Sequence, residues 1–130
     1  MKRVLFVCVE NSFRSQIAEA FFNSMAKNAR ASSAGTRHAE KVSSTAIQLM
    51  KEVGIDMSGA KPKMLTPEMV EEADRVISMG CEVGEVCPGV VADEDWGLED
   101  PIGKPIEKAR EIRNMIKAKV ERLVAELSLE

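Results

Sequence analysis

The chain has 130 residues, a length that predicts one domain spanning residues 1–130 around a single hydrophobic core. Its 18 basic and 21 acidic residues give a net charge of −3, which argues against a nucleic-acid binder that works through a basic surface. No stretch approaches the roughly 20 apolar residues that a membrane-spanning helix needs. The first apolar run is also too short for a signal peptide. The sequence therefore predicts a cytoplasmic protein that binds neither nucleic acid nor membrane.

The first third of the chain predicts a strand, a helix and a second strand. Residues 3–9, RVLFVCV, form a continuous apolar run rich in β-branched residues, which is typical of a strand covered on both faces. Residues 29–35 end in a glycine turn and predict another short strand. Between them, residues 15–27 carry an apolar face with helical spacing. This face consists of Ile17, Ala18, Phe21, Phe22, Met25 and Ala26.

Two further helices are predicted in the middle of the chain. Ser43 or Ser44 caps the first of them, and Gly54 closes it at its C-terminal end. Thr66 caps the second, which has Pro67 as its first residue and acidic side chains in its first turns.

The last part of the chain predicts two strands and a long helix. Residues 74–80, DRVISMG, are a strand-like apolar run, and residues 90–97 hold a short fourth strand. A long helix is predicted from Pro105 onward, with one apolar stripe. The stripe consists of Ile106, Ala109, Ile112, Ile116, Val120, Leu123, Val124 and Leu127.

Strands that alternate with helices predict an α/β fold with a mostly parallel sheet covered on both faces. In such folds, ligands bind at the carboxyl ends of the strands. Three chemically interesting segments lie at such ends: Cys8, residues 78–81 and the segment around Asp100. We therefore expect these segments to meet in one site.

Cys8 ends the first predicted strand, and Arg14 follows six residues later at the start of the helix. A loop in this place can turn its backbone N–H groups inward to bind an anion, and the helix N-terminus adds partial positive charge. Arg14 can donate two parallel hydrogen bonds to an oxyanion. The same positive field favours the Cys8 thiolate, to which Ser15 can donate. The alternative is a buried cysteine beside a surface arginine, but the strand before and the helix after favour the functional interpretation.

This stretch resembles the phosphate loop of the low-molecular-weight tyrosine phosphatases and of the thioredoxin-coupled arsenate reductases. The motif CVENSFRSQIAEAF carries the resemblance, which continues in SSAGT at residues 32–36 and in WGLEDPIGK at residues 96–104. The resemblance covers nearly the whole chain in the right order. It implies a four-stranded parallel sheet flanked by helices on both faces.

The resemblance also implies the residues that bind the oxyanion. Asn11 matches the loop asparagine of this family, a residue that tolerates a left-handed backbone. Glu10 stands where the family usually has glycine, and Phe13 replaces a frequent second loop cysteine. The predicted oxyanion loop consists of Val9, Glu10, Asn11, Ser12, Phe13, Arg14 and Ser15.

Asp100, directly before Pro101, matches the family aspartate that protonates the departing oxygen as a general acid. Trp96 is predicted to pack near the site. The other carboxylates of this segment are predicted to form a solvated acidic loop, namely Asp93, Glu94, Asp95 and Glu99.

Cys81 and Cys87 lie in MGCEVGEVCP, residues 79–88, where the arsenate reductases carry a cysteine pair and the phosphatases need none. The first cysteine and the neighbouring glycine have exchanged places relative to the family motif. The resemblance implies a relay in which Cys8 attacks arsenate, Cys81 attacks Cys8 and Cys87 attacks Cys81. A thioredoxin-like reductant then opens the last disulfide, and no bound redox cofactor is required. The spacing of the three cysteines and of the single histidine does not fit a zinc site, so no metal is predicted.

Two other functions remain open from the sequence. A small phosphomonoesterase or protein tyrosine phosphatase would use Cys8, Arg14 and Asp100 alone, because phosphate and arsenate have nearly the same shape. The second open function is a non-catalytic module that binds oxyanions or senses redox state. The additional carboxylate of Glu10 supports it, because a negative charge near the loop repels anionic substrates.

Overall fold

The computed structural model describes residues 2–37, 39–80 and 92–129. Its centre is a four-stranded sheet in which every neighbouring pair of strands is parallel, as predicted, with the strand order β2-β1-β3-β4. The strands are β1 (Lys2–Cys8), β2 (Ala29–Gly35), β3 (Arg75–Ser78) and β4 (Glu94–Asp95). Because β1 lies between β2 and β3, the chain that leaves β1 at Cys8 emerges in the middle of the carboxyl edge of the sheet.

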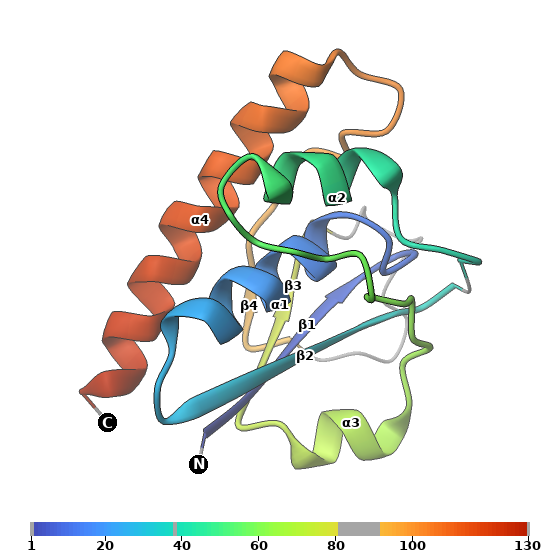
Figure 1. The fold of residues 1–130 in the computed structure, drawn as a ribbon. Coiled ribbons are helices and arrows are strands. Elements are labelled where there is room, and N and C mark those ends of the chain that lie inside the picture. The colour runs from blue at the N-terminus through green and yellow to red at the C-terminus, as the bar shows by residue number, and fades with distance from the viewer. Residues whose placement is uncertain (1, 38, 81–91, 130) are drawn as a thin grey trace.

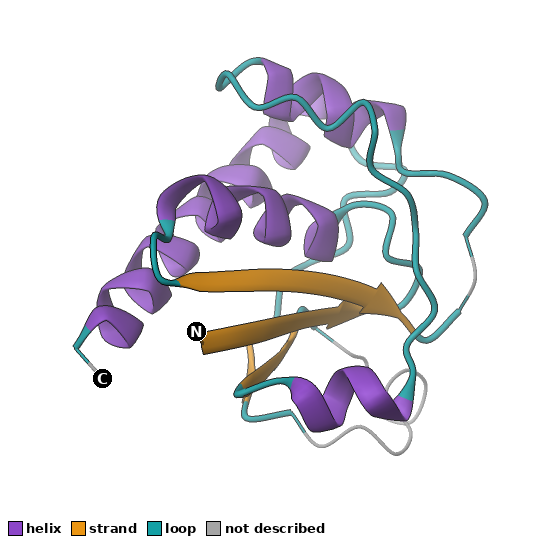
Figure 2. Ribbon diagram, turned by 60° about the horizontal axis from the view of Figure 1, so that its bottom comes forward, coloured by secondary structure: helices purple, strands orange, loops and turns teal. Residues whose placement is uncertain are grey.

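Helices cover both faces of this sheet, as Figure 2 shows. One face carries α1 (Arg14–Met25), α2 (Ser44–Lys51) and α4 (Ile106–Ser128), and the other carries α3 (Pro67–Glu72). Alternate residues of β1 point to opposite faces, so Val4, Phe6 and Cys8 join the larger core while Leu5 and Val7 join the smaller one. This two-sided burial explains why β1 is apolar throughout.

The helix ends follow the predicted caps. The Ser43 hydroxyl accepts a hydrogen bond from the backbone N–H of Ala46 at 3.4 Å, and Thr66 accepts one from Met69 at 3.3 Å. Helix α1 starts one residue earlier than predicted. Within the described ranges, no helix is both long and apolar enough to cross a membrane.

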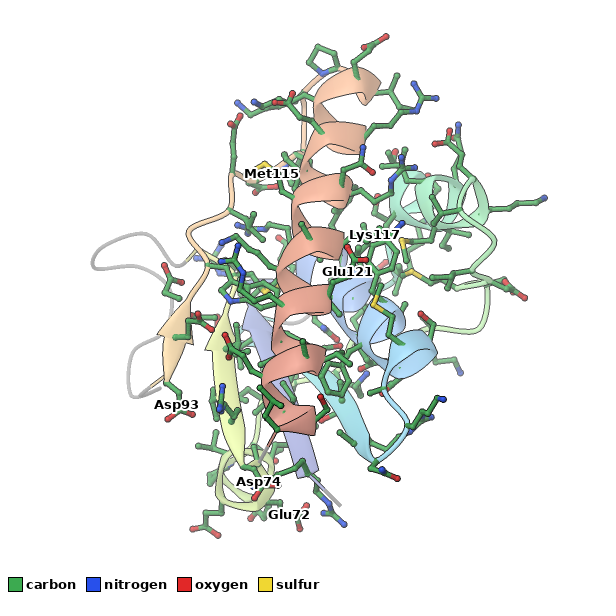
Figure 3. The ribbon with its side chains drawn as sticks, turned by 90° about the vertical axis from the view of Figure 1, so that its left-hand side faces the viewer. Glu72, Asp74, Asp93, Met115, Lys117 and Glu121 are labelled. Carbon is green, nitrogen blue, oxygen red and sulfur yellow. The ribbon has the colours of Figure 1, made fainter. Side chains whose placement is uncertain are left out.

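Strand β4 is shorter than the predicted strand at residues 90–97, of which residues 90 and 91 lie outside the described part. Its first contact with β3 is made through a side chain, because Asp93 Oδ2 accepts a hydrogen bond from the backbone N–H of Val76 at 2.7 Å. The backbone N–H of Asp93 returns a bond to Val76 O at 2.8 Å. Figure 3 shows Asp93 at the start of β4. The Asp93 carboxylate therefore accepts a hydrogen bond from β3 that a backbone carbonyl of a neighbouring strand would otherwise accept.

The turn after α2 is linked to α4 by a carboxylate that two arginines share. Arg110 Nη2 and Arg113 Nη1 donate to the two oxygens of Glu52 at 2.9 and 2.8 Å. Arg113 is almost buried and also donates to Leu49 O at 2.9 Å. Hydrogen bonds from the side chains of Arg110 and Arg113 lower the pKa of Glu52 from its usual 4.5 to about 2.

A Glu52→Gln variant is expected to lower the thermal unfolding midpoint at pH 7. Since the pKa is depressed in the folded state, the carboxylate stabilises the fold above pH 4.5, and this contribution is lost as the pH falls toward 2. The difference between variant and wild type should therefore shrink in calorimetric scans below pH 4.5. Glu121→Gln, at an exposed position of α4 (Figure 3), is the control for a charge change on the same helix. Equal midpoints for Glu52→Gln and wild type at pH 7 would contradict the expectation.

Candidate active site

The loop between β1 and α1 consists of residues 9–13 and depends on one residue with a left-handed backbone. Asn11 has φ of 56° and is fully buried. Asparagine adopts this conformation more readily than most residues, which explains why the position need not be glycine. The turn at Asn11 brings the loop back over the end of β1.

The side chain of Asn11 is held in one orientation by its neighbours. Asn11 Oδ1 accepts hydrogen bonds from the backbone N–H of Lys63 and from Gln16 Nε2, both at 2.9 Å. Because a backbone N–H can only donate, the oxygen of the amide must face Lys63 and the nitrogen must face the other way. Asn11 Nδ2 accordingly donates to Ser15 Oγ at 2.8 Å.

Cys8 Sγ lies at the end of this hydrogen-bond chain. It accepts a bond from the backbone N–H of Asn11 at 3.2 Å and lies 2.8 Å from Ser15 Oγ. Either atom of the second contact can donate, because Ser15 Oγ keeps its own proton and a second lone pair while it accepts from Asn11 Nδ2. Cys8 is 5% exposed, and these two groups supply the polar contacts that the described residues offer to its sulfur. The sulfur is therefore positioned by one backbone contact from the loop and one side-chain contact from α1.

Arg14, the first residue of α1, is nearly buried and is fixed from two other segments of the chain. Its Nη1 donates to Leu98 O at 2.8 Å and to Met79 O at 3.2 Å. Met79 follows β3, and Leu98 lies beyond β4. These bonds orient the guanidinium, and Arg14 lines the same cavity as Cys8.

A cavity of about 580 Å³ opens above Cys8 and joins the predicted site residues. Cys8, Arg14 and Asp100 all line it. Of the seven residues predicted to bind the oxyanion, Asn11 and Ser15 lie behind this surface and act on Cys8 through hydrogen bonds. The other five line the cavity, namely Val9, Glu10, Ser12, Phe13 and Arg14.

Asp100 is exposed at the rim of this cavity. One carboxylate oxygen, Oδ1, accepts a hydrogen bond from the backbone N–H of Ile102 at 3.0 Å, which fixes the local turn. The second oxygen accepts no hydrogen bond from the described residues. Asp100 therefore presents one carboxylate oxygen without a hydrogen bond from the described residues at the cavity that Cys8 also lines.

Asp95 has a more specific role than the solvated acidic loop predicted for it. Its Oδ1 accepts hydrogen bonds from the Ser78 hydroxyl at 2.6 Å and from the backbone N–H of Gly80 at 2.9 Å. Asp93 likewise pairs with β3, so two of the four carboxylates are tied to the strand. Their alternate spacing, with Asp93 directly before β4 and Asp95 at its end, is the sequence signal that points to this role.

Gly35, at the end of β2, supports the loop from below. A methyl group placed on its Cα would lie 2.7 Å from Val9 O and 2.9 Å from Asn11 N. The backbone N–H groups of the next two residues, Thr36 and Arg37, donate to Cys8 O and Val9 O at 3.2 and 2.8 Å. The SSAGT segment therefore holds the loop by backbone contacts that leave no room for a side chain.

Known proteins resemble this chain over nearly its whole length. The family model described as low molecular weight phosphotyrosine protein phosphatase matches residues 3–130. The chain belongs to this family. A glutaredoxin arsenate reductase of Synechocystis sp. is 40% identical, over 98% of this chain and 100% of that protein. Arsenate reductase 2 of Staphylococcus epidermidis is 32% identical, over 92% of this chain and 94% of its own length.

The solved structures similar to this chain include both reductases and phosphatases. An arsenate reductase in the phosphate binding state superimposes with a TM-score of 0.85 and 40% identity, covering 97% of this chain and 98% of that one. The YwlE arginine phosphatase from Geobacillus stearothermophilus has a TM-score of 0.83 and 27% identity, covering 99% and 94% of the two chains. Proteins named for two kinds of chemistry therefore share the fold of this chain.

Cys81 and Cys87, the two cysteines predicted to act after Cys8, lie outside the described residues. Their predicted role in a disulfide relay therefore stays a prediction. Among the described residues, no group of three or more histidine, cysteine or acidic side chains could hold a metal ion.

Proposed function

We propose that this protein is an arsenate reductase that transfers electrons from its own cysteines to arsenate. One observation carries the proposal: Cys8 Sγ accepts a hydrogen bond from the loop backbone and contacts Ser15 Oγ, at a cavity that it shares with Arg14 and Asp100. A small tetrahedral oxyanion fits this arrangement of donors around one nucleophile. The names of the reductase relatives support arsenate as that oxyanion.

The first step is a nucleophilic displacement at arsenic. The Cys8 thiolate forms a bond to As(V), while Asp100 donates a proton to the oxygen that leaves as water. Arg14 and the loop N–H groups bind the remaining oxygens and stabilise the charge that develops on them. Because carbonyl oxygens fix the Arg14 guanidinium in advance, it does not have to reorganise when the anion binds.

The second step reduces the arsenic. Cys81 attacks Cys8 Sγ, and the electron pair of the sulfur–arsenic bond passes to arsenic, which leaves as As(III) arsenite. Cys87 then attacks Cys81 and frees Cys8, so that one disulfide between Cys81 and Cys87 has formed for each arsenate reduced. Each exchange requires the two Cα atoms to come within about 7 Å of each other.

A dithiol redox protein restores the reduced enzyme. The resemblance suggests thioredoxin, whereas the relative from Synechocystis is named a glutaredoxin arsenate reductase. We therefore propose a small thiol reductant of the thioredoxin or glutaredoxin class. Parallel turnover assays with each of the two distinguish between them.

A Cys87→Ala variant tests the relay. We expect it to lose multiple-turnover arsenate reduction and to keep hydrolysis of an aryl phosphate within about twofold of wild type, because the phosphatase reaction needs only the loop and the acid. Arsenate-dependent oxidation of the reductant and release of the aryl alcohol are the two measurements. Arsenate turnover at the wild-type rate in the variant would refute the relay.

A phosphatase is the second candidate, favoured by the similarity to the YwlE arginine phosphatase structure. Such an enzyme would form a phosphorylated Cys8 and hydrolyse it, with Arg14 and Asp100 in the roles given above. Wild-type phosphatase activity without arsenate-dependent oxidation of either reductant would favour this function. Inactivity in both assays would favour a module that only binds oxyanions or senses redox state.

A further inference from the structure

Glu10 places a carboxylate on the oxyanion loop itself, two residues after Cys8. Its side chain is exposed and lines the same cavity as Cys8. Neither the fold of the loop nor the proposed chemistry uses this carboxylate. The left-handed residue of the loop is Asn11, so Glu10 does not serve the turn either.

Glu10 is also the carboxylate of the rim that has no partner among the described residues. Glu99 lies 2.7 Å from Lys104 Nζ and 3.6 Å from Lys108 Nζ, and the hydrogen bond from Lys104 lowers the pKa of Glu99 below its usual range. Asp95 accepts two hydrogen bonds and Asp100 accepts one. Of the rim carboxylates, Glu10 is therefore the one whose negative charge is least offset by neighbouring cations or hydrogen-bond donors, and it repels an approaching anion most.

The two guanidinium groups that line the cavity do not cancel this charge. Arg14 is nearly buried, and its Nη1 is bound to two carbonyl oxygens. Arg37 lines the cavity at the surface, but no ion pair joins it to Glu10 in the described part of the chain. The positive charge of Arg14 thus lies deep in the cavity, whereas the negative charge of Glu10 lies at the rim without an ion-pair partner among the described residues.

We propose that Glu10 is a specificity-determining residue that selects oxyanions of low charge. This proposal rests on the proposed function, because it requires that the loop bind oxyanions. The repulsion between Glu10 and a bound anion is proportional to the charge of the anion. Glu10 therefore penalises a dianion twice as strongly as a monoanion in free energy, and it disfavours phosphoesters that carry further negative groups. The preferred ligands are small, singly charged oxyanions and phosphate groups on neutral or cationic carriers.

Sulfate and methyl sulfate test this proposal, since both present tetrahedral oxygens and their charges of −2 and −1 do not change near neutral pH. Calorimetry at constant ionic strength gives the affinity of wild type and of Glu10→Gln for each anion. We expect the variant to bind sulfate about 5- to 10-fold more tightly and methyl sulfate about 2- to 3-fold more tightly, as for one unit charge removed several ångströms away in a solvent-screened site. Added salt should reduce both gains.

Glu71→Gln is the matched control, because it changes the net charge by the same amount at an exposed position of α3. Helix α3 leads into the start of β3, so its C-terminal turn, which ends at the residue Glu72 labelled in Figure 3, lies toward the amino edge of the sheet and away from the loop. The proposal would be overturned if Glu10→Gln increased the affinity for the two anions by the same factor, or if Glu71→Gln increased the affinity as much as Glu10→Gln does. Either outcome would leave the proposed function intact. If neither wild type nor Glu10→Gln binds either anion, the oxyanion site itself is refuted, and both proposals fail.

Discussion

A Cys8→Ser variant is expected to lose arsenate reduction and phosphatase activity together, each by roughly 1,000-fold or more. The serine hydroxyl is not ionised at neutral pH, so it cannot replace the thiolate as nucleophile. The loop should keep its shape, because the backbone N–H of Asn11 and the hydroxyl of Ser15 can hydrogen-bond to oxygen as they do to sulfur. Turnover assays with arsenate and with an aryl phosphate measure the loss.

Anion binding separates this loss of chemistry from a loss of structure. Calorimetry should show that Cys8→Ser still binds inorganic phosphate, since Arg14 and the loop N–H groups are unchanged. Cys8→Ala serves as a second variant, which removes the hydrogen bonds of the side chain as well. Substantial turnover by either variant would show that another group attacks the substrate, and the mechanism proposed above would then be wrong.

A Gly35→Ala variant is expected to disable the site from outside the loop. The added methyl group would meet Val9 O at 2.7 Å and the carbonyl carbon of Glu10 at 2.8 Å. Backbone atoms cannot rotate out of the way as a side chain can, so the loop must move, and with it the N–H group of Asn11 that donates to Cys8. We expect phosphate affinity and turnover to fall at least tenfold, and the free energy of unfolding to fall by about 1–3 kcal/mol.

Gly59→Ala is the matched control, because no heavy atom lies within 4 Å of a methyl group at that position. Chemical denaturation and phosphate calorimetry on both variants compare the two glycines directly. Wild-type phosphate affinity in Gly35→Ala would mean that the loop tolerates displacement, and the close packing at the end of β2 would then have no functional consequence.

Much of the fold follows from the sequence because the periodicities are strong. The apolar run before Cys8 predicts a strand buried on both faces, and the serine and threonine caps locate α2 and α3 within a residue. The edge strand β4 was harder to predict, because its residues are acidic and exposed. It is held to β3 partly by Asp93, and a side chain that replaces a backbone partner leaves no periodic signal.

The sequence predicts which residues form the site better than it predicts how they act. Cys8, Arg14 and Asp100 do line one cavity, as their places at strand ends suggest. The orientation of Asn11 was not predictable, because it depends on Lys63, a residue 52 positions away. The role of Gly35 beneath the loop was missed for the same reason: it is defined by backbone contacts between distant segments.

The two carbonyl oxygens that hold Arg14 belong to Met79 and Leu98, one on either side of residues 81–91 in the chain (Figure 1). One guanidinium thus joins the chain directly after β3 to the chain beyond β4. By thermodynamic reciprocity, whatever shifts Met79 or Leu98 enough to alter these bonds changes the affinity for the anion, and an occupied loop resists that shift by the same free energy.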